Sequence, residues 1–117
     1  TDGPDLRVLE YTGIARDSSL EKAAEQSGAG TDIDSGPLQT KHAYDLIVAG
    51  TSVQGATIGP GPGYMGRLLT PGNGSLAEDT IVTSPGTYTA TAMQNGSDGD
   101  FWAIDAIAFR GAADAPP

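Results

Sequence analysis

Apolar and polar residues alternate in several short runs along the chain, with turn-forming residues between the runs. The clearest run is 44–50, YDLIVAG, in which Leu46 and Val48 alternate with Ile47 and Ala49. A period of two residues is typical of a β-strand, because successive side chains point to opposite faces. The runs predict strands at 6–12, near Ile33, and at 38–42, 44–50, 64–70, 78–84, 87–93 and 101–110, with weaker alternation over 51–63.

Three of these runs also indicate their place in a sheet. Runs 44–50 and 101–110 are apolar on both faces, which predicts inner strands. Run 87–93 carries threonines on one face and Tyr88 with two alanines on the other, which predicts a half-buried strand. Pro85-Gly86 divides this run from 78–84, and the pattern predicts that the two form a hairpin.

Residues 18–26, SSLEKAAEQ, carry the only helical signal. Ser18 can cap a helix, and Glu21 follows at the spacing of a capping box. The run is short and ends in SGAG, so a helix here would be marginal on its own. A helix, a strand and an irregular crossing all stay open for this segment.

About eight short strands, with turn signals between them, predict an all-β antiparallel sandwich of the jelly-roll or immunoglobulin-like kind. A chain of 117 residues has room for one core. We therefore expect a single domain over 1–111, followed by a linker-like tail over 112–117.

Composition excludes several classes of function. The 15 acidic and 6 basic residues give a net charge of −9, which argues against binding to duplex nucleic acid or to an anionic membrane surface. No apolar run is long enough to span a membrane. The absence of cysteine removes disulfides, thiolate metal sites and cysteine nucleophiles.

Four blocks occur in a recognisable order: Leu9-Glu10-Tyr11-Thr12-Gly13, then 45–50 (DLIVAG), then 77–79 (AED) with 86–92 (GTYTATA), then Trp102 with 108–110 (AFR). In this order and spacing they resemble a bacterial extracellular β-sandwich module that recurs in large secreted and surface proteins. The resemblance covers roughly residues 5–111. It implies a non-catalytic extracellular or cell-surface module that serves adhesion, structural spacing or subunit assembly.

In that family, the matching elements form the C-terminal part of a longer domain. The resemblance therefore leaves three possibilities for the missing strands. They come from an N-terminal half of the same protein, they come from a second chain by strand sharing, or this variant closes its sandwich without them. An exposed inner strand edge would need a cover of some kind.

Carbohydrate binding is the main alternative function, as a module of a secreted hydrolase. Trp102 follows a polar turn and Tyr64 follows a Gly/Pro loop, so either ring could be presented to a polysaccharide. Trp102 has apolar neighbours on both faces of its run, which favours a place in the core instead.

Structural calcium is the one cofactor that the sequence suggests. Asp32 and Asp34 lie in one acidic turn, and Asp98 and Asp100 lie in another. The second turn lacks the glutamate that would complete an EF-hand, because Ala106 stands at that position. Both segments also suit ordinary turns.

The sequence offers no catalytic residue with a supporting motif. The single histidine, His42, lies beside Lys41 and is expected at the surface. Glu10, Glu78 and Asp79 could form the carboxylate pair of a glycosidase or lyase, but a structural role is favoured. We expect Glu10 to be partly buried and paired with Arg67 or Arg110. We therefore expect that this protein is not an enzyme.

Overall fold

The computed structural model describes residues 9–16, 19–53, 56–69, 75–95 and 100–112. This part of the chain contains eight strands and no helix. The strands are β1 (Leu20–Ala29), β2 (Asp32–Thr40), β3 (Asp45–Val53), β4 (Ala56–Pro60), β5 (Met65–Leu69), β6 (Leu76–Val82), β7 (Gly86–Asn95) and β8 (Phe101–Arg110).

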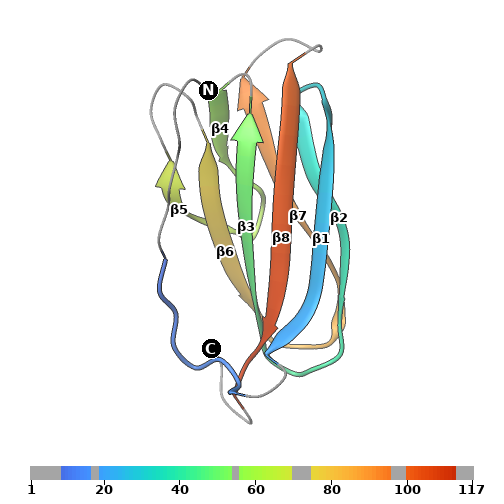
Figure 1. The fold of residues 1–117 in the computed structure, drawn as a ribbon, viewed down its shortest axis with the longest axis vertical. Coiled ribbons are helices and arrows are strands. Elements are labelled where there is room, and N and C mark those ends of the chain that lie inside the picture. Colours follow the sequence, from blue (N-terminus) through green and yellow to red (C-terminus); the bar gives the residue numbers. More distant parts are fainter. Residues whose placement is uncertain (1–8, 17–18, 54–55, 70–74, 96–99, 113–117) are drawn as a thin grey trace.

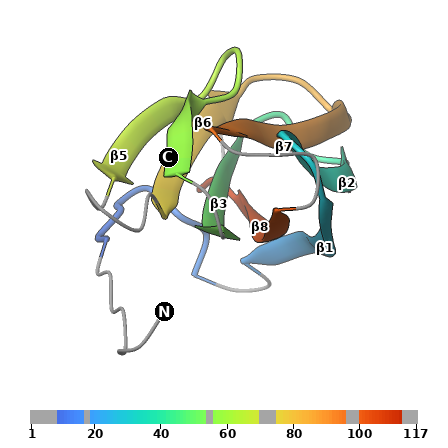
Figure 2. The same ribbon diagram turned by 90° about the horizontal axis from the view of Figure 1, so that it is seen from above.

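The strands form two antiparallel sheets that pack face to face (Figures 1 and 2). The larger sheet has the order β1-β8-β3-β6-β5, and the smaller has the order β2-β7-β4. The pairing is nested, since β1 pairs with β8, β2 with β7 and β3 with β6. This is the jelly-roll arrangement. The predicted all-β sandwich is confirmed, and its nested pairs match those of a jelly roll except that β5 pairs with β6 and not with β4.

Several predicted strands are confirmed, including the two expected inside a sheet. β8 lies between β1 and β3, and β3 lies between β8 and β6. The ambiguous segment 18–26 falls largely within β1, so here the strand was the correct alternative. The predicted strand 6–12 is not confirmed, because residues 9–12 lie outside every strand and 6–8 lie outside the described residues.

The predicted hairpin of 78–84 with 87–93 is wrong. Both segments are strands, β6 and β7, but they belong to different sheets. β6 pairs with β3 and β5, and β7 pairs with β2 and β4. The Pro85-Gly86 turn therefore carries the chain from one layer to the other. Turn chemistry alone does not distinguish such a crossing from a hairpin.

The core lies between the sheets and receives the inward face of each strand. Its largest members are Ile33, Leu38, Ile47, Leu76, Trp102 and Ile104. Tyr88, Ala90 and Ala92 of β7 face this core, as the alternation of threonine and apolar residues predicts. Alternation in β3 and β6 also places Asp45 and Glu78 on the inward face, in register with apolar neighbours.

Candidate functional site

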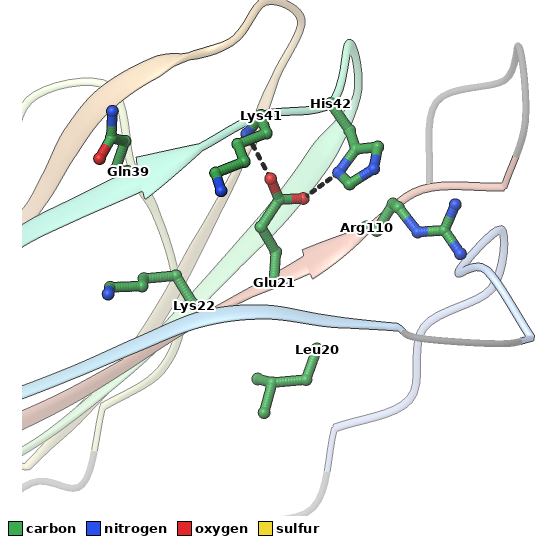
Figure 3. A pocket seen from close by; sticks show the side chains of 7 residues that line it. All are labelled: Leu20, Glu21, Lys22, Gln39, Lys41, His42 and Arg110. Atoms are coloured by element: carbon green, nitrogen blue, oxygen red, sulfur yellow. Dashed lines mark hydrogen bonds and ion pairs between the residues drawn. The ribbon is translucent and has the colours of Figure 1, made fainter.

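A cleft of about 520 Å³ opens between the two sheets where β1 begins and β2 ends. β1 and β2 are the edge strands of their sheets, and both lie on the same side of the sandwich (Figure 1). The cleft is lined by Leu20, Glu21, Lys22, Gln39, Lys41, His42 and Arg110 (Figure 3).

A β-bulge in β1 sets the direction of Glu21. Leu20 is paired with Phe109 and Lys22 with Ala108, so Glu21 is the extra residue between two paired positions. A bulge puts two consecutive side chains on one side of a strand. Figure 3 shows this result, since Glu21 and Lys22 both rise toward β2 while Leu20 points the other way.

Glu21 joins β1 to the connection between β2 and β3. One carboxylate oxygen accepts the backbone N–H of Lys41, and Oε2 lies 2.6 Å from Nδ1 of His42 (Figure 3). The side chain of Glu21 is 5% exposed, whereas that of His42 is 50% exposed. Burial by itself raises the pKa of Glu21, but the donors from Lys41 and His42 outweigh it and hold this pKa below its ordinary value.

Asp45, the first residue of β3, lies beneath this contact. It is fully buried, and within the described residues neither of its carboxylate oxygens has a hydrogen-bond partner. One ligand atom from each of Asp45, Glu21 and His42 lies within 4.8 Å of the other two. Burial raises the pKa of Asp45 to about 7, and the neighbouring Glu21 carboxylate acts in the same direction. Arg110 and His42 oppose this rise.

Basic groups concentrate around the same opening. The whole chain has six lysines and arginines, and three of them, Lys22, Lys41 and Arg110, line this cleft together with the single histidine. Lys22 comes from β1 and Lys41 from the end of β2, so the two amino groups approach the opening from different sheets (Figure 3). In a chain of net charge −9, this is a local positive surface.

A second pair of acids lies on β6, but its members point to opposite faces of the sheet. Asp79 accepts hydrogen bonds from Tyr11 Oη at 2.5 Å and from Arg67 Nε at 2.8 Å. Glu78 faces the core, where Oε2 accepts the backbone N–H of Gly61 at 3.3 Å and Oε1 has no partner. Adjacent residues of a strand cannot converge on one substrate between them.

Burial raises the pKa of Glu78 to about 7; the Gly61 N–H lowers it and the charge of Asp79 raises it further. Tyr64 is half-buried against the core near this carboxylate. Its own pKa is raised to about 12, by burial and then by Glu78. Of the two aromatic residues proposed for sugar stacking, Trp102 is 7% exposed and packs in the core.

Of the four aspartates predicted to bind calcium, the three that the structure describes are not part of the acidic cluster in the cleft. Asp32 and Asp34 are exposed on β2, and Asp34 Oδ1 accepts the N–H of Gly36 at 2.7 Å. Asp98 lies outside the described residues. The main-chain oxygen of Asp100 accepts hydrogen bonds from Gly30 and Gln94. Among the described residues, the group placed for a metal ion is Glu21, His42 and Asp45.

The ion pair expected between Glu10 and Arg67 or Arg110 is not formed; Arg67 pairs with another acid. Glu10 is exposed, and Arg67 binds Asp79 instead. Arg110 lines the cleft and acts electrostatically on Asp45. The sequence analysis did not single out Glu21 or Asp45. Asp45 shares the parity of the buried Ile47 and Ala49, so alternation could have revealed it, whereas the bulge removes any such signal for Glu21.

Comparisons with known proteins do not place the chain in a family: no family model, no curated protein and no solved structure matches it. Within the residues that the structure describes, no helix has the length and apolar character needed to cross a membrane.

Proposed function

We propose that this protein is a non-catalytic module of an extracellular or cell-surface protein, and that it binds an acidic polysaccharide in the cleft between its sheets. The observation that carries this proposal is the concentration of Lys22, Lys41 and Arg110 around one opening of a strongly acidic chain. The extracellular location rests on the resemblance of the sequence blocks.

The shape and chemistry of the cleft suit a uronic acid residue. A volume of about 520 Å³ is in the range of small-molecule sites. Lysine and arginine bind carboxylates through charge-assisted hydrogen bonds, and the amide of Gln39 can both donate to and accept from sugar hydroxyls. Lys22 and Lys41 are exposed, so their ammonium groups are accessible to a ligand.

Binding of polygalacturonate, measured by isothermal titration calorimetry, tests this proposal. We expect binding that weakens with added salt, and about tenfold weaker binding by the Lys22→Gln variant, as for the loss of one charge-assisted contact. Fully methyl-esterified polygalacturonate, which lacks the free carboxylates, should not bind.

Arg67→Gln is the matched control, because it removes the same charge from β5 at the opposite edge of the larger sheet. Equal loss of affinity in this variant would show that general electrostatics, and not the cleft, attracts the polymer. Equal binding of the esterified polymer would contradict carboxylate recognition. Release of reducing ends or unsaturated products would favour the glycosidase or lyase alternative.

Assembly by strand sharing is a second candidate, favoured by the free edge of β1. This strand has ten residues, and among the strands that the structure describes it is hydrogen-bonded to β8 alone. Its stretch from Ala23 to Ala29 contains one charged residue, Glu25, so charge protects this edge weakly. Such an edge can accept an extended strand from a second copy of the chain.

Light scattering coupled to size exclusion tests assembly. We expect the apparent mass to rise from one copy toward two as protein concentration increases to roughly 100 μM, the range of a weak edge contact. A constant monomer mass over the whole series would contradict strand sharing and would leave the polysaccharide proposal untouched.

A further inference from the structure

We infer that Glu21, His42 and Asp45 form a binding site for a divalent transition metal ion at the base of the cleft. This inference goes beyond the proposed function and does not depend on it. It rests on two separate observations: the convergence of three donor side chains, and the orphaned state of the most buried of them.

The first observation is the convergence. Glu21 comes from the bulge of β1, His42 from the connection after β2, and Asp45 from the start of β3. Glu21 on β1 thus meets His42 and Asp45 beyond the end of β2, and one imidazole nitrogen and two carboxylate oxygens lie within 4.8 Å of one another. Donor atoms on one metal ion lie roughly 3–3.5 Å apart when each bond is about 2.1 Å long. The exposed ring of His42 and the long side chain of Glu21 can supply the small adjustment.

The second observation is the state of Asp45. Its carboxylate is fully buried, and both oxygens are without a hydrogen-bond partner. A buried acceptor left unsatisfied is costly, so native proteins normally provide a donor, a water molecule or an ion. The carboxylate lies within 4.8 Å of Glu21 and His42, which line the cleft, so a cation entering from solvent would reach it.

The donor set indicates the class of metal. Calcium and magnesium prefer oxygen ligands alone, whereas an imidazole with carboxylates suits zinc and its neighbours. Three protein ligands leave at least one coordination position open toward the cleft. The bond between His42 Nδ1 and Glu21 Oε2, 2.6 Å long, would be replaced by bonds from both atoms to the metal. Lys22, Lys41 and Arg110 oppose a cation electrostatically, which predicts moderate affinity.

Zinc chloride titrated into the metal-free protein, followed by calorimetry, tests the site directly. We expect one zinc ion per chain. His42→Ala should weaken binding at least about tenfold, since one of three protein ligands is lost. Asp45→Asn should have a similar effect, because a neutral amide is a poorer ligand than a carboxylate. Calcium at the same concentration should not compete.

Glu25→Gln is the control for unspecific attraction, because it removes an acid from the exposed surface of the same strand. Absence of binding up to about 1 mM zinc overturns the inference. Binding that persists unchanged in His42→Ala also overturns it. The ring of His42 is exposed, so this variant should fold even if Asp45→Asn does not. Polygalacturonate binding is measured without metal, so either proposal can fail alone.

Discussion

Replacing Glu78 with Gln is expected to raise the thermal midpoint of unfolding by roughly 8 °C at pH 8 and to change it little at pH 5, for a stability gain of about 2 kcal/mol. Glu78 is fully buried on the inward face of β6. Its ionised form is held by one long hydrogen bond from Gly61, and Oε1 has no partner. Gln keeps the shape and an acceptor for Gly61 but carries no charge.

The sign of the pH dependence follows from the raised pKa. Folding raises the pKa of Glu78 from 4.5 to about 7, chiefly through burial. The folded state therefore binds more protons than the unfolded state between these values, and Glu78 destabilises the fold progressively as pH rises through this window. The pKa shift corresponds to a destabilisation by the ionised carboxylate on the order of 3 kcal/mol. The gain from Gln is smaller, because its buried amide also has a desolvation cost.

Thermal melts of the wild type and of Glu78→Gln at pH 5, 6, 7 and 8 measure the effect. The two curves should lie closest at pH 5, separate progressively up to about pH 7 and stay apart at pH 8. Glu10→Gln serves as the control, because Glu10 is exposed and its replacement should shift the midpoint little at any of these values. A Glu78→Gln variant that is less stable than the wild type at pH 8 would show that the carboxylate is satisfied in solution.

Replacing Gly61 with Ala is expected to destabilise the protein by about 2–3 kcal/mol, the cost of overpacking a tight contact. Gly61 lies in the segment 59–63, GPGPG, where the chain leaves β4 and approaches β7. A Cβ atom on Gly61 would lie 2.0 Å from Oγ1 of Thr91 and 2.5 Å from its backbone oxygen. The side chain of Thr91 can turn, but the backbone of the central strand β7 cannot easily move away.

Gly59→Ala is the matched control two residues earlier, near the end of β4. A Cβ atom at Gly59 meets nothing within 4 Å, so this variant should be neutral or slightly more stable, through a smaller loss of chain entropy. Denaturant unfolding of both variants gives the comparison. Equal stability of the two would contradict the close approach of this loop to β7. Because Gly61 also donates to Glu78, its variant should also alter the pH dependence.

Alternation of apolar and polar residues predicted where strands occur but not which strands pair with each other. Residues 101–110 are a strand over the whole predicted range, and this strand lies between β1 and β3 and buries one face in the core while the other is exposed or half-buried. Residues 87–93 show the predicted inward face, because Tyr88, Ala90 and Ala92 alternate with threonines and pack in the core or against it. The hairpin between 78–84 and 87–93 failed because a Pro-Gly turn fits a crossing between layers as well as a turn within one. The run 18–26 stayed ambiguous in the sequence, since the bulge at Glu21 breaks the period of two.

The sequence by itself determined that this chain is an all-β sandwich with β3 and β8 inside a sheet, since alternation, turn residues and length act locally and can be seen in the order of residues. It also contains no cysteine, which excludes cysteine chemistry. Only the tertiary structure decided where the charged groups meet. The pairing of Arg67 with Asp79, the burial of Asp45 and Glu78 without full hydrogen bonding, and the meeting of Glu21 with His42 all depend on contacts between different strands and their connections. Contacts of this kind are set by sheet register and by bulges such as those at Glu21 and Arg67, and local composition reveals neither.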